Sequence, residues 1–320
     1  MNRLFADMHC DTLTTLYDKR VKGSEETMRE NSLHIDFLKL QKSRYLLQNF
    51  AVFFDKEVWA HNLFQEAMLR IAFFEKEIAQ NQDIIRQVTT YDEIMNNESE
   101  NHISALLTLE GGESLEGNVD NLYKFHEKGV RMITLTWNYD NELGYCHFDT
   151  EGKGLTKLGF EVVEQMENLH MIPDVSHGSD TLFWDVCKIA KKPFVASHSN
   201  ARCVYDRTRN MSDDMIRALA EHGGVMGMNF FAGFISARAR EDGMCYMEDM
   251  LKHMKHVVNV GGIDVIGLGS DFDGIGTDVE WKDAGGMELL LDGMKKTGFS
   301  ESQCDKICRD NVLRLYKECL

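Results

Sequence analysis

The sequence predicts an α/β fold, a (β/α)₈ TIM barrel made by one domain that spans residues 1–320. Two observations favour this fold. Eight short apolar runs alternate with helical segments, and such alternation favours a closed barrel over an open doubly wound sheet. Five of the eight runs end in histidine or a carboxylate, and barrels of this kind carry their functional groups at the ends of their strands.

The eight predicted strands are apolar on both faces, as parallel strands buried between helices are. Glycine ends the preceding helix at 126–129, 221–224 and 260–262, where it suits the left-handed backbone conformation. The predicted strands cover residues 4–10, 46–53, 103–109, 131–136, 171–176, 194–197, 225–230 and 265–270.

Helices are expected between these strands. Four apolar positions indicate a long helix before the third strand: Val58, Met68, Ile71 and Ile78. Ser212 is the expected cap of a helix over 213–221. Ser300 and Gln303 have the form of a capping box at the start of the last helix. The long interval from 11 to 48 leaves room for additional helices.

The composition excludes several classes of function. The net charge of −17 argues against binding to nucleic acid or to anionic lipid, both of which favour a basic surface. No run approaches the ~20 apolar residues of a membrane span, and no signal-peptide pattern precedes the first strand. The eight cysteines include no CxxC pair, and Cys304 and Cys308 have the spacing of one buried helix face. We therefore expect reduced thiols and a cytoplasmic protein.

The first polar strand end carries His9 and Asp11. Alternate strand residues point to the same side, so both side chains can reach one metal ion while Cys10 faces the helices. Taken alone, this pair is more often a simple hydrogen-bonded pair. Glu110 follows the third strand and precedes two glycines, where it could bridge two ions or cap the next helix.

Three further strand ends carry His177, His198 and Asp271. Each has an ordinary explanation by itself, as a histidine bonded to backbone or a carboxylate in a turn. Together the five strand ends bring three imidazoles and three carboxylates to one mouth of the barrel, and burying them without an ion is costly. A pair of divalent cations resolves this cost. Imidazole and carboxylate ligands suit zinc, with manganese and cobalt as alternatives.

These residues, in this order, resemble the renal (membrane) dipeptidase family of zinc metallopeptidases, peptidase family M19. The resemblance covers nearly the whole chain, and its combination of motifs is specific. The matching stretches are DMHCDT at 7–12, TLEGGE at 108–113, LTWN at 135–138, PDVSH at 173–177, ASHSNAR at 196–202, RTRN at 207–210, GLGSDFDG at 267–274 and NVLRLY at 311–316.

The resemblance implies a metal-dependent barrel of the amidohydrolase type that holds two zinc ions and hydrolyses dipeptides with a zinc-activated hydroxide. The implied ligands are His9 and Asp11 for the first zinc, His177 and His198 for the second, and Glu110 as the bridge. A D-residue at the C-terminal position of the substrate is compatible with this assignment. The expected partner is the dipeptide alone, with no membrane and no nucleic acid, and a homodimer stays open.

Two further roles follow from the resemblance. Arg209 matches the arginine that binds the substrate's carboxylate, through a planar fork suited to that group. Asp271 matches the catalytic acid that contacts the substrate amine and transfers protons. Position favours Asp271 over Asp273 for this role, because Asp271 directly follows the strand while Asp273 stands at the turn and is expected to tie down the loop.

One position departs from the family. Vertebrate members carry a histidine in the LTWN stretch that polarises the scissile carbonyl, and Trp137 stands there in this chain. His147, Asn138 and Asn141 are the candidates to replace it. Two other functions stay open beside dipeptide hydrolysis. One is another amidohydrolase activity, such as that of a deacetylase or a lactonase, and the other is binding of metal or a small molecule without catalysis.

Overall fold

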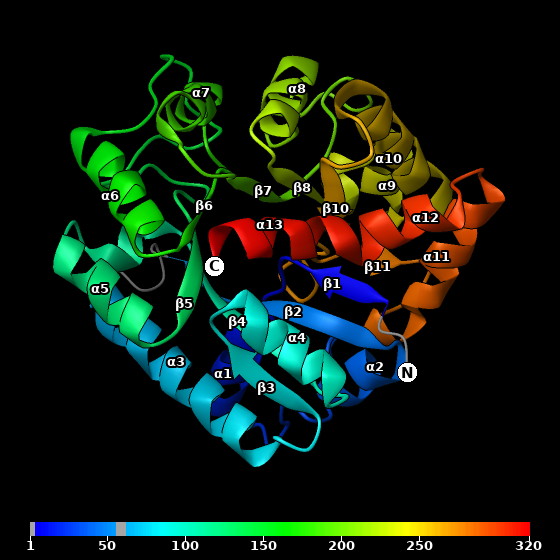
Figure 1. Cartoon of the computed structure of the whole chain (residues 1–320), viewed down its shortest axis with the longest axis horizontal. Coiled ribbons are helices and arrows are strands. Elements are labelled where there is room, and N and C mark those ends of the chain that lie inside the picture. Colours follow the sequence, from blue (N-terminus) through cyan, green and yellow to red (C-terminus); the bar gives the residue numbers. More distant parts are fainter. Residues whose placement is uncertain (1–3, 56–61) are drawn as a thin grey trace.

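Eight parallel strands close into a barrel with helices around it, in a computed structural model that describes residues 4–55 and 62–320 (Figure 1). The order around the barrel is β2-β1-β10-β8-β7-β6-β5-β4, and pairing of β2 with β4 closes it. The barrel strands are β1 (Phe5–Asp7), β2 (Tyr45–Val52), β4 (Ile103–Glu110), β5 (Val130–Thr134), β6 (Ile172–Asp174), β7 (Val195–Ser199), β8 (Val225–Met228) and β10 (Ile266–Leu268). The predicted barrel is confirmed.

All eight predicted strands lie where the sequence placed them, but most end earlier. The strand predicted over 4–10 is β1, which ends at Asp7, and that predicted over 265–270 is β10, which ends at Leu268. The remaining residues leave the regular hydrogen-bonded ladder and carry the polar side chains of the barrel mouth. The sequence predicts strand at these residues because their neighbours remain apolar beyond the hydrogen-bonded ladder.

The structure also contains short strands that the sequence analysis missed. β3 (Ile85–Val88) pairs with the first half of β4, and β5 pairs with the second half on the same side. Only two of its four residues are buried, so β3 lacks the continuous apolar run that marked the barrel strands. β9 (Met244–Cys245) and β11 (Asp278–Val279) form a separate pair of two residues each, too short for a pattern.

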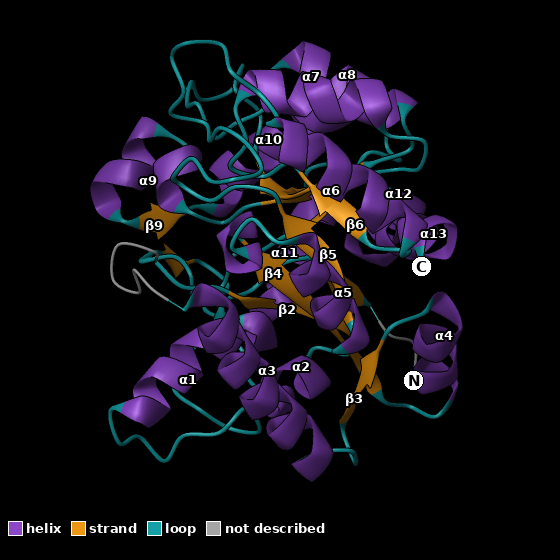
Figure 2. Ribbon diagram, turned by 90° about the vertical axis from the view of Figure 1, so that its left-hand side faces the viewer, coloured by secondary structure: helices purple, strands orange, loops and turns teal. Residues whose placement is uncertain are grey.

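Helices cover the outside of the barrel (Figure 2). They are α1 (Thr12–Val21), α2 (Phe37–Lys42), α3 (Leu63–Gln80), α4 (Tyr91–Ser99), α5 (Val119–Glu127), α6 (Lys157–Asn168), α7 (Asp180–Ile189), α8 (Asp213–Glu221), α9 (Ala237–Asp242), α10 (Met247–Gly261), α11 (Met287–Lys296), α12 (Glu301–Asp305) and α13 (Asn311–Cys319). The predicted long helix is α3, although Val58 lies outside the described residues. α1 and α2 are the additional helices expected before the second strand.

The predicted caps are confirmed. The Ser212 hydroxyl accepts a hydrogen bond from the Met215 amide at the start of α8. Ser300 and Gln303 form the capping box of α12. The cysteines of the last helical segment, Cys304 and Cys308, are both buried, and no disulfide joins the eight cysteines.

The last helix, α13, closes the N-terminal end of the barrel (Figure 1). Its apolar residues pack into one cluster with a layer of side chains from the barrel strands, including Met8, Leu106 and Ile172. The Asn311 side-chain amide donates to the carbonyl of Ile266, the first residue of β10, at 2.8 Å. Because this end is sealed, the opposite end, where the strands terminate, is the accessible mouth.

A second, larger cluster of buried apolar residues lies between the strands and the surrounding helices. Cys10 belongs to it, as predicted, and its thiol lies 3.2 Å from the Asn49 carbonyl. Within the described residues, no helix combines the length and the apolar character needed to cross a bilayer.

Candidate metal centre and active site

Glu110 lies at the centre of a group of buried histidines at the barrel mouth. It is the last residue of β4, and its two carboxylate oxygens face different partners. Oε1 lies 3.1 Å from His177 Nε2 and 3.3 Å from His198 Nε2, whereas Oε2 lies 3.5 Å from His9 Nε2. One oxygen toward each side is the arrangement of a carboxylate that bridges two ions.

The second half of the cluster surrounds His9. Its Nε2 atom lies 3.4 Å from Asp11 Oδ2 and 3.8 Å from Asp271 Oδ1. The structure therefore brings together all six side chains that the sequence placed at the strand ends. They form two groups, with Glu110 between them: His9 with the acids on one side, and His177 with His198 on the other.

The donor atoms fit divalent metal ions better than they fit one another. Two atoms that each lie about 2.0–2.1 Å from a tetrahedral ion are about 3.3 Å apart, close to the separations seen here. His9 Nε2 and Asp11 Oδ1 are buried, and neither has a hydrogen-bond partner among the described residues. Unpaired buried polar atoms are costly, so a ligand role explains their placement. The donors are imidazole nitrogen and carboxylate oxygen, a set that zinc accepts.

The backbone is in the left-handed region at two of these residues. His177 has φ 66° and Asp271 has φ 60°, conformations that few residues other than glycine adopt. Both residues lie just beyond a strand, and the left-handed conformation turns each side chain into the barrel mouth. Such conformations concentrate at functional sites because the surrounding structure holds them.

Outer hydrogen bonds orient His177. Its Nδ1 atom lies 2.8 Å from Asn138 Oδ1, which leaves Nε2 to face Glu110. His147 also contacts Asn138 Oδ1, through Nε2 at 3.1 Å, and its Nδ1 lies 2.7 Å from the Thr208 hydroxyl. One proton assignment satisfies these three contacts: both histidines donate to the Asn138 oxygen, and the Thr208 hydroxyl donates to His147. A metal-binding His177 requires this same tautomer.

His198 is oriented by a similar series of hydrogen bonds. Its Nδ1 lies 2.7 Å from the Ser197 hydroxyl, and that hydroxyl donates to Asp174 Oδ2 at 2.5 Å. Asp174 also accepts from the Ser197 amide at 2.9 Å. Hydrogen bonds of this kind fix the ring and raise the basicity of a ligand histidine. Asp174 and Ser197 were not predicted from the sequence. A carboxylate inside an apolar strand, at Asp174, is the feature that could have indicated them.

Burial and neighbouring charges shift the pKa values of the cluster in opposite directions. Burial alone would lower the pKa of His9, but the charges of Glu110 and Asp11 and their contacts with the imidazole together outweigh burial and raise that pKa well above its usual value. Burial, aided by the charge of Glu110, raises the pKa of Asp11 well above the usual range. Burial likewise raises the pKa of Asp271 to about 6. Burial and the nearby Arg209 lower the pKa of His177 to about 3. Without an ion, the cluster thus retains protons that metal binding would displace.

Arg209 is buried beside the cluster and carries an unused hydrogen-bond donor. Its guanidinium donates to the His198 carbonyl at 3.1 Å and to the Ser199 hydroxyl at 3.4 Å, while Nε has no partner. Burial lowers its pKa to about 10, so it stays charged at neutral pH. It makes no ion pair with a carboxylate in the described part of the chain. The group is therefore available to an anionic ligand.

A cavity of about 190 Å³ opens onto part of the cluster, and Arg209 is not among the residues that line it. Its walls combine cluster residues with aromatic side chains: Asp11, Phe53, Glu110, Trp137, Asn138, His177, Phe231, Phe234, Asp271, Gly274 and Ile275. The aromatic residues Phe53, Phe231 and Phe234 were not identified from the sequence, because nothing local distinguishes them from core residues. The size suits a small substrate.

The structure distinguishes the three candidates to replace the histidine that vertebrate members carry where this chain has Trp137. Asn138 lines the cavity beside Trp137, and its Nδ2 group has no hydrogen bond in the described residues. Asn141 instead donates to Glu113 at 3.0 Å and to the Leu135 carbonyl at 2.9 Å, which ties it into the loop. His147 does not line the cavity, and its Nε2 atom contacts the side-chain oxygen of Asn138. Of these three candidates, Asn138 is the one that lines the cavity described by the structure, and its Nδ2 group is a free donor there.

The two acids of the strand-end motif occupy different environments. Asp271 Oδ2 accepts from Asn229 Nδ2 at 2.8 Å, and its Oδ1 faces His9. Asp273 accepts from the His34 amide at 2.7 Å and from the Thr12 hydroxyl at 2.5 Å. Asp273 thus ties the loop to α1 and to the segment before α2, as expected, while Asp271 faces the cluster.

The fold and this site together define a metal-dependent hydrolase of the (β/α)₈ barrel type. Comparison with known proteins narrows the class. The model of the membrane dipeptidase family, peptidase family M19, matches residues 2–319, and the chain belongs to that family.

Individual relatives agree with this family. A protein of Klebsiella pneumoniae, "Uncharacterized protein in pqqA 5'region", is 31% identical over 254 residues, which are 78% of this chain and 94% of the relative. An uncharacterized dipeptidase of Schizosaccharomyces pombe is 34% identical over 221 residues, 68% of this chain and 53% of the relative. The chain spans about half the length of this relative and of the mammalian dipeptidase 3 proteins it matches.

A solved structure shares the fold over its full length. The metallopeptidase of Rhodobacter sphaeroides, bound to a phosphinate mimic of the dipeptide L-Ala-D-Ala, superposes with a TM-score of 0.91 and 22% identity, covering 100% of both chains. At that identity the likeness establishes the fold alone.

Proposed function

We propose that this protein is a dipeptidase that hydrolyses short peptides with a free C-terminal carboxylate. It would use two divalent metal ions, and zinc is the expected metal. Membership of the family supports dipeptide hydrolysis. The observation that carries the proposal is Arg209, which is buried and charged beside the candidate ligand cluster and makes no ion pair with any carboxylate of the described residues. A guanidinium in this position matches the free carboxylate of a small substrate.

The proposed ligands are His9 and Asp11 for one ion, His177 and His198 for the other, and Glu110 for both. When bound, the ions would activate a water molecule and polarise the scissile carbonyl. The protein residues supply orientation. Asn138 and Ser197 contact the Nδ1 atoms of the two histidines on one side of Glu110, so their Nε2 atoms face Glu110.

Three residues act on the substrate in this proposal. Arg209 binds the C-terminal carboxylate and restricts the substrate length. Asn138 donates from its free Nδ2 group to the carbonyl oxygen, in place of the histidine that vertebrate relatives carry at Trp137. Asp271 contacts the amine and transfers the proton to the leaving nitrogen. We include dipeptides with a C-terminal D-residue, because the Rhodobacter sphaeroides relative binds a mimic of L-Ala-D-Ala. A cytoplasmic location and a homodimer stay predictions.

Hydrolysis of a dipeptide panel tests the proposal, with amino acid release measured alongside metal content. We expect turnover of free dipeptides, poor turnover of amidated dipeptides and tripeptides, and close to two divalent ions per chain. Arg209→Lys should lose most of kcat/KM because lysine lacks the fork. N-acetyl amino acids and lactones serve as control substrates for the alternative amidohydrolase activities. Equal rates on free and amidated dipeptides would rule out the role of Arg209.

A further inference from the structure

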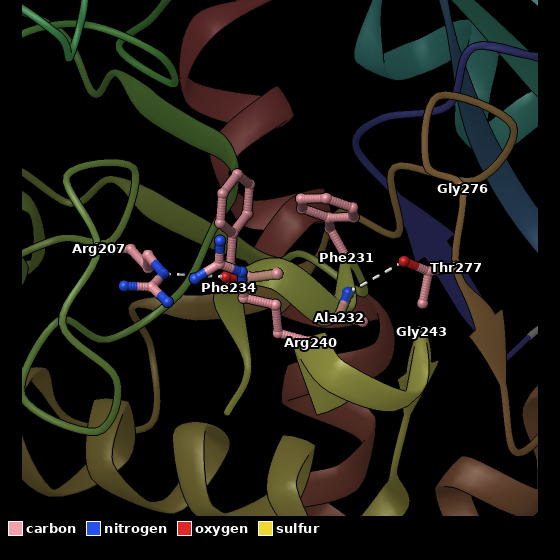
Figure 3. A pocket seen from close by; sticks show the side chains of 9 residues that line it. Arg207, Phe231, Ala232, Phe234, Arg240, Gly243, Gly276 and Thr277 are labelled. Atoms are coloured by element: carbon pink, nitrogen blue, oxygen red, sulfur yellow. Dashed lines mark hydrogen bonds between the residues drawn. The ribbon is translucent and has the colours of Figure 1, made fainter. Parts of the chain in front are cut away.

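A second cavity, of about 490 Å³, adjoins the one that holds the candidate ligands (Figure 3). The two cavities share Phe231 and Phe234, whose rings contact each other edge-to-face with centroids 4.8 Å apart. The second cavity is lined by Arg207, Phe231, Ala232, Gly233, Phe234, Arg240, Gly243, Gly276 and Thr277. The phenylalanine pair is thus a wall that the two cavities share.

The described lining of this cavity is positively charged, whereas the chain as a whole has a net negative charge. The protein has 52 acidic and 35 basic residues, yet the described residues that line the cavity include two arginines and no carboxylate. Figure 3 shows the side chains of Arg207 and Arg240 extending into the same region beside Phe234. Two like charges in one hollow repel each other, and an anion placed between them would relieve that repulsion.

Neither arginine has an acidic partner in the described residues. Arg207 donates from Nε to the Gly233 carbonyl at 3.3 Å and from Nη1 to the Asp206 carbonyl at 3.0 Å, and it lies over the Tyr205 ring. These neutral contacts hold the side chain without neutralising its charge. The Arg240 guanidinium has no hydrogen bond or ion pair in the same residues. By contrast, Arg238 of the same helix is paired with Asp249 at 2.9 Å.

Phe234 links this cavity to the carboxylate-binding arginine. The Arg209 guanidinium lies over the Phe234 ring, 5.3 Å from its centroid, and the same residue lines the arginine cavity. A substrate whose C-terminal carboxylate is held by Arg209 therefore has its C-terminal residue next to Phe234. A side chain that extended past this ring would enter the cavity that Arg207 and Arg240 line.

We propose that the arginine cavity binds an acidic side chain on the C-terminal residue of the substrate, so that the enzyme prefers dipeptides ending in glutamate or aspartate. This inference rests on the proposed dipeptidase function. The planar guanidinium groups suit a carboxylate, and the phenylalanine pair packs against the methylene groups before it. Hydrogen bonds to charged groups of this kind favour the acidic substrate by roughly ten- to a hundredfold.

The test compares Ala-Glu with Ala-Gln, which have nearly the same shape and differ in charge. The wild-type protein should show a kcat/KM ratio of roughly 10 to 100 in favour of Ala-Glu. The ratio should decrease as salt rises, because salt screens partly exposed charges. In Arg240→Gln and in Arg207→Gln the ratio should fall toward one, and Arg240→Glu should favour Ala-Lys over Ala-Glu.

Arg238→Gln is the matched control, since it removes an arginine from the same helix outside the cavity; its ratio should equal that of the wild type. Thermal unfolding of each variant checks that the fold is retained. A wild-type ratio near one, or an unchanged ratio in the folded Arg207→Gln/Arg240→Gln double variant, overturns the inference while turnover of Ala-Ala leaves the dipeptidase proposal standing. Absence of turnover on every dipeptide overturns both.

Discussion

Asp271 and Asp273 lie two positions apart in the sequence, yet different groups surround them, and this indicates different roles. Asp271 is buried among the candidate ligands, with one oxygen held by Asn229 and the other facing His9. Asp273 is bonded to the His34 amide and the Thr12 hydroxyl, away from the cavity. An acid that transfers a proton must reach the substrate, and only Asp271 lines the cavity.

Asp271→Asn should therefore reduce kcat by ~10²–10⁴-fold while the metal content stays close to that of the wild type. Asp273→Asn should leave kcat nearly unchanged per folded molecule and lower the melting temperature, because a carboxylate that accepts several hydrogen bonds is replaced. Steady-state kinetics, elemental analysis and thermal unfolding measure the three quantities. Full turnover in Asp271→Asn with a folded but inactive Asp273→Asn would reverse the assignment.

Asn138 combines two roles at one side chain, and two substitutions separate them. Its oxygen orients His177, and its Nδ2 group is free to donate to the substrate. Asn138→Ala removes both groups, so metal affinity should fall by about 10–100-fold and kcat should fall as well. Asn138→Asp keeps an oxygen for His177 but loses the donor, so it should retain metal with a reduced kcat. Metal titration and kinetics on both variants decide; an Asn138→Asp protein with wild-type kcat contradicts the donor role.

At the scale of elements, close approach of strands sets the shape of the mouth. A Cβ atom at Gly269, directly after β10, would overlap the carbonyl oxygen of Ser197 in β7. Backbone surrounds this position on both sides, since Gly227 of β8 is the other neighbour, so no side chain can move aside. Glycine here allows β7, with its candidate ligand His198, to lie close to the strand that leads into Asp271.

Gly269→Ala should therefore destabilise the protein by about 1–3 kcal/mol or more, because the added methyl forces the backbone to shift. Gly276→Ala is the control, since a Cβ there meets nothing within 4 Å and its φ lies outside the left-handed range. Denaturant unfolding compares the two variants. Equal stability of both would show that the strands can separate at no cost.

Helix α10 is held by a buried neutral histidine, and this makes its attachment sensitive to acid. The His253 imidazole accepts from the Ala201 amide at 3.2 Å and donates to the Ile235 carbonyl at 2.7 Å. Protonation would turn the accepting nitrogen into a donor and break the first bond. Burial lowers the pKa of His253 to about 4, below the ordinary value of 6.5.

The unfolded chain therefore binds this proton at higher pH than the folded protein does. Stability from His253 is fully present above pH 6.5 and is lost as the pH falls toward about 4, at no more than about 1.4 kcal/mol per pH unit. His253→Gln keeps a donor and an acceptor without titrating, so its free energy of unfolding should fall less over that interval. Denaturant unfolding from pH 7 to pH 4 measures the difference; parallel curves would exclude a contribution from His253.

For the whole molecule, we expect metal binding to be coupled to folding, because the six candidate ligand residues come from distant parts of the barrel. Removing the ions leaves buried acids and imidazoles without partners, as the unpaired atoms of His9 and Asp11 indicate. Treatment with a chelator should lower the melting temperature, and zinc should restore it. At one hundred times the dissociation constant, bound metal stabilises by about 2.7 kcal/mol per site. Glu110→Gln should bind both ions more weakly and respond less to zinc. An unchanged melting temperature after verified metal loss contradicts the coupling.

The sequence alone determined the fold class and the residues of the candidate centre. Eight apolar runs marked the barrel strands, and the polar residues at five of their ends proved to lie together at the mouth. Both signals are local: burial between helices makes a strand apolar throughout, and the barrel places every strand end at the same mouth. The short strand β3 escaped prediction because half of its residues are only partly buried.

Only the tertiary structure decided among residues with no local signature. It placed Asn138 at the cavity, whereas His147 and Asn141 do not line it and are held by Thr208 and Glu113. It joined Arg207 and Arg240 in one cavity, and it sealed the far end of the barrel with α13. These features depend on contacts between residues far apart in the chain, and the direction of a loop side chain is set by those contacts rather than by its neighbours in sequence.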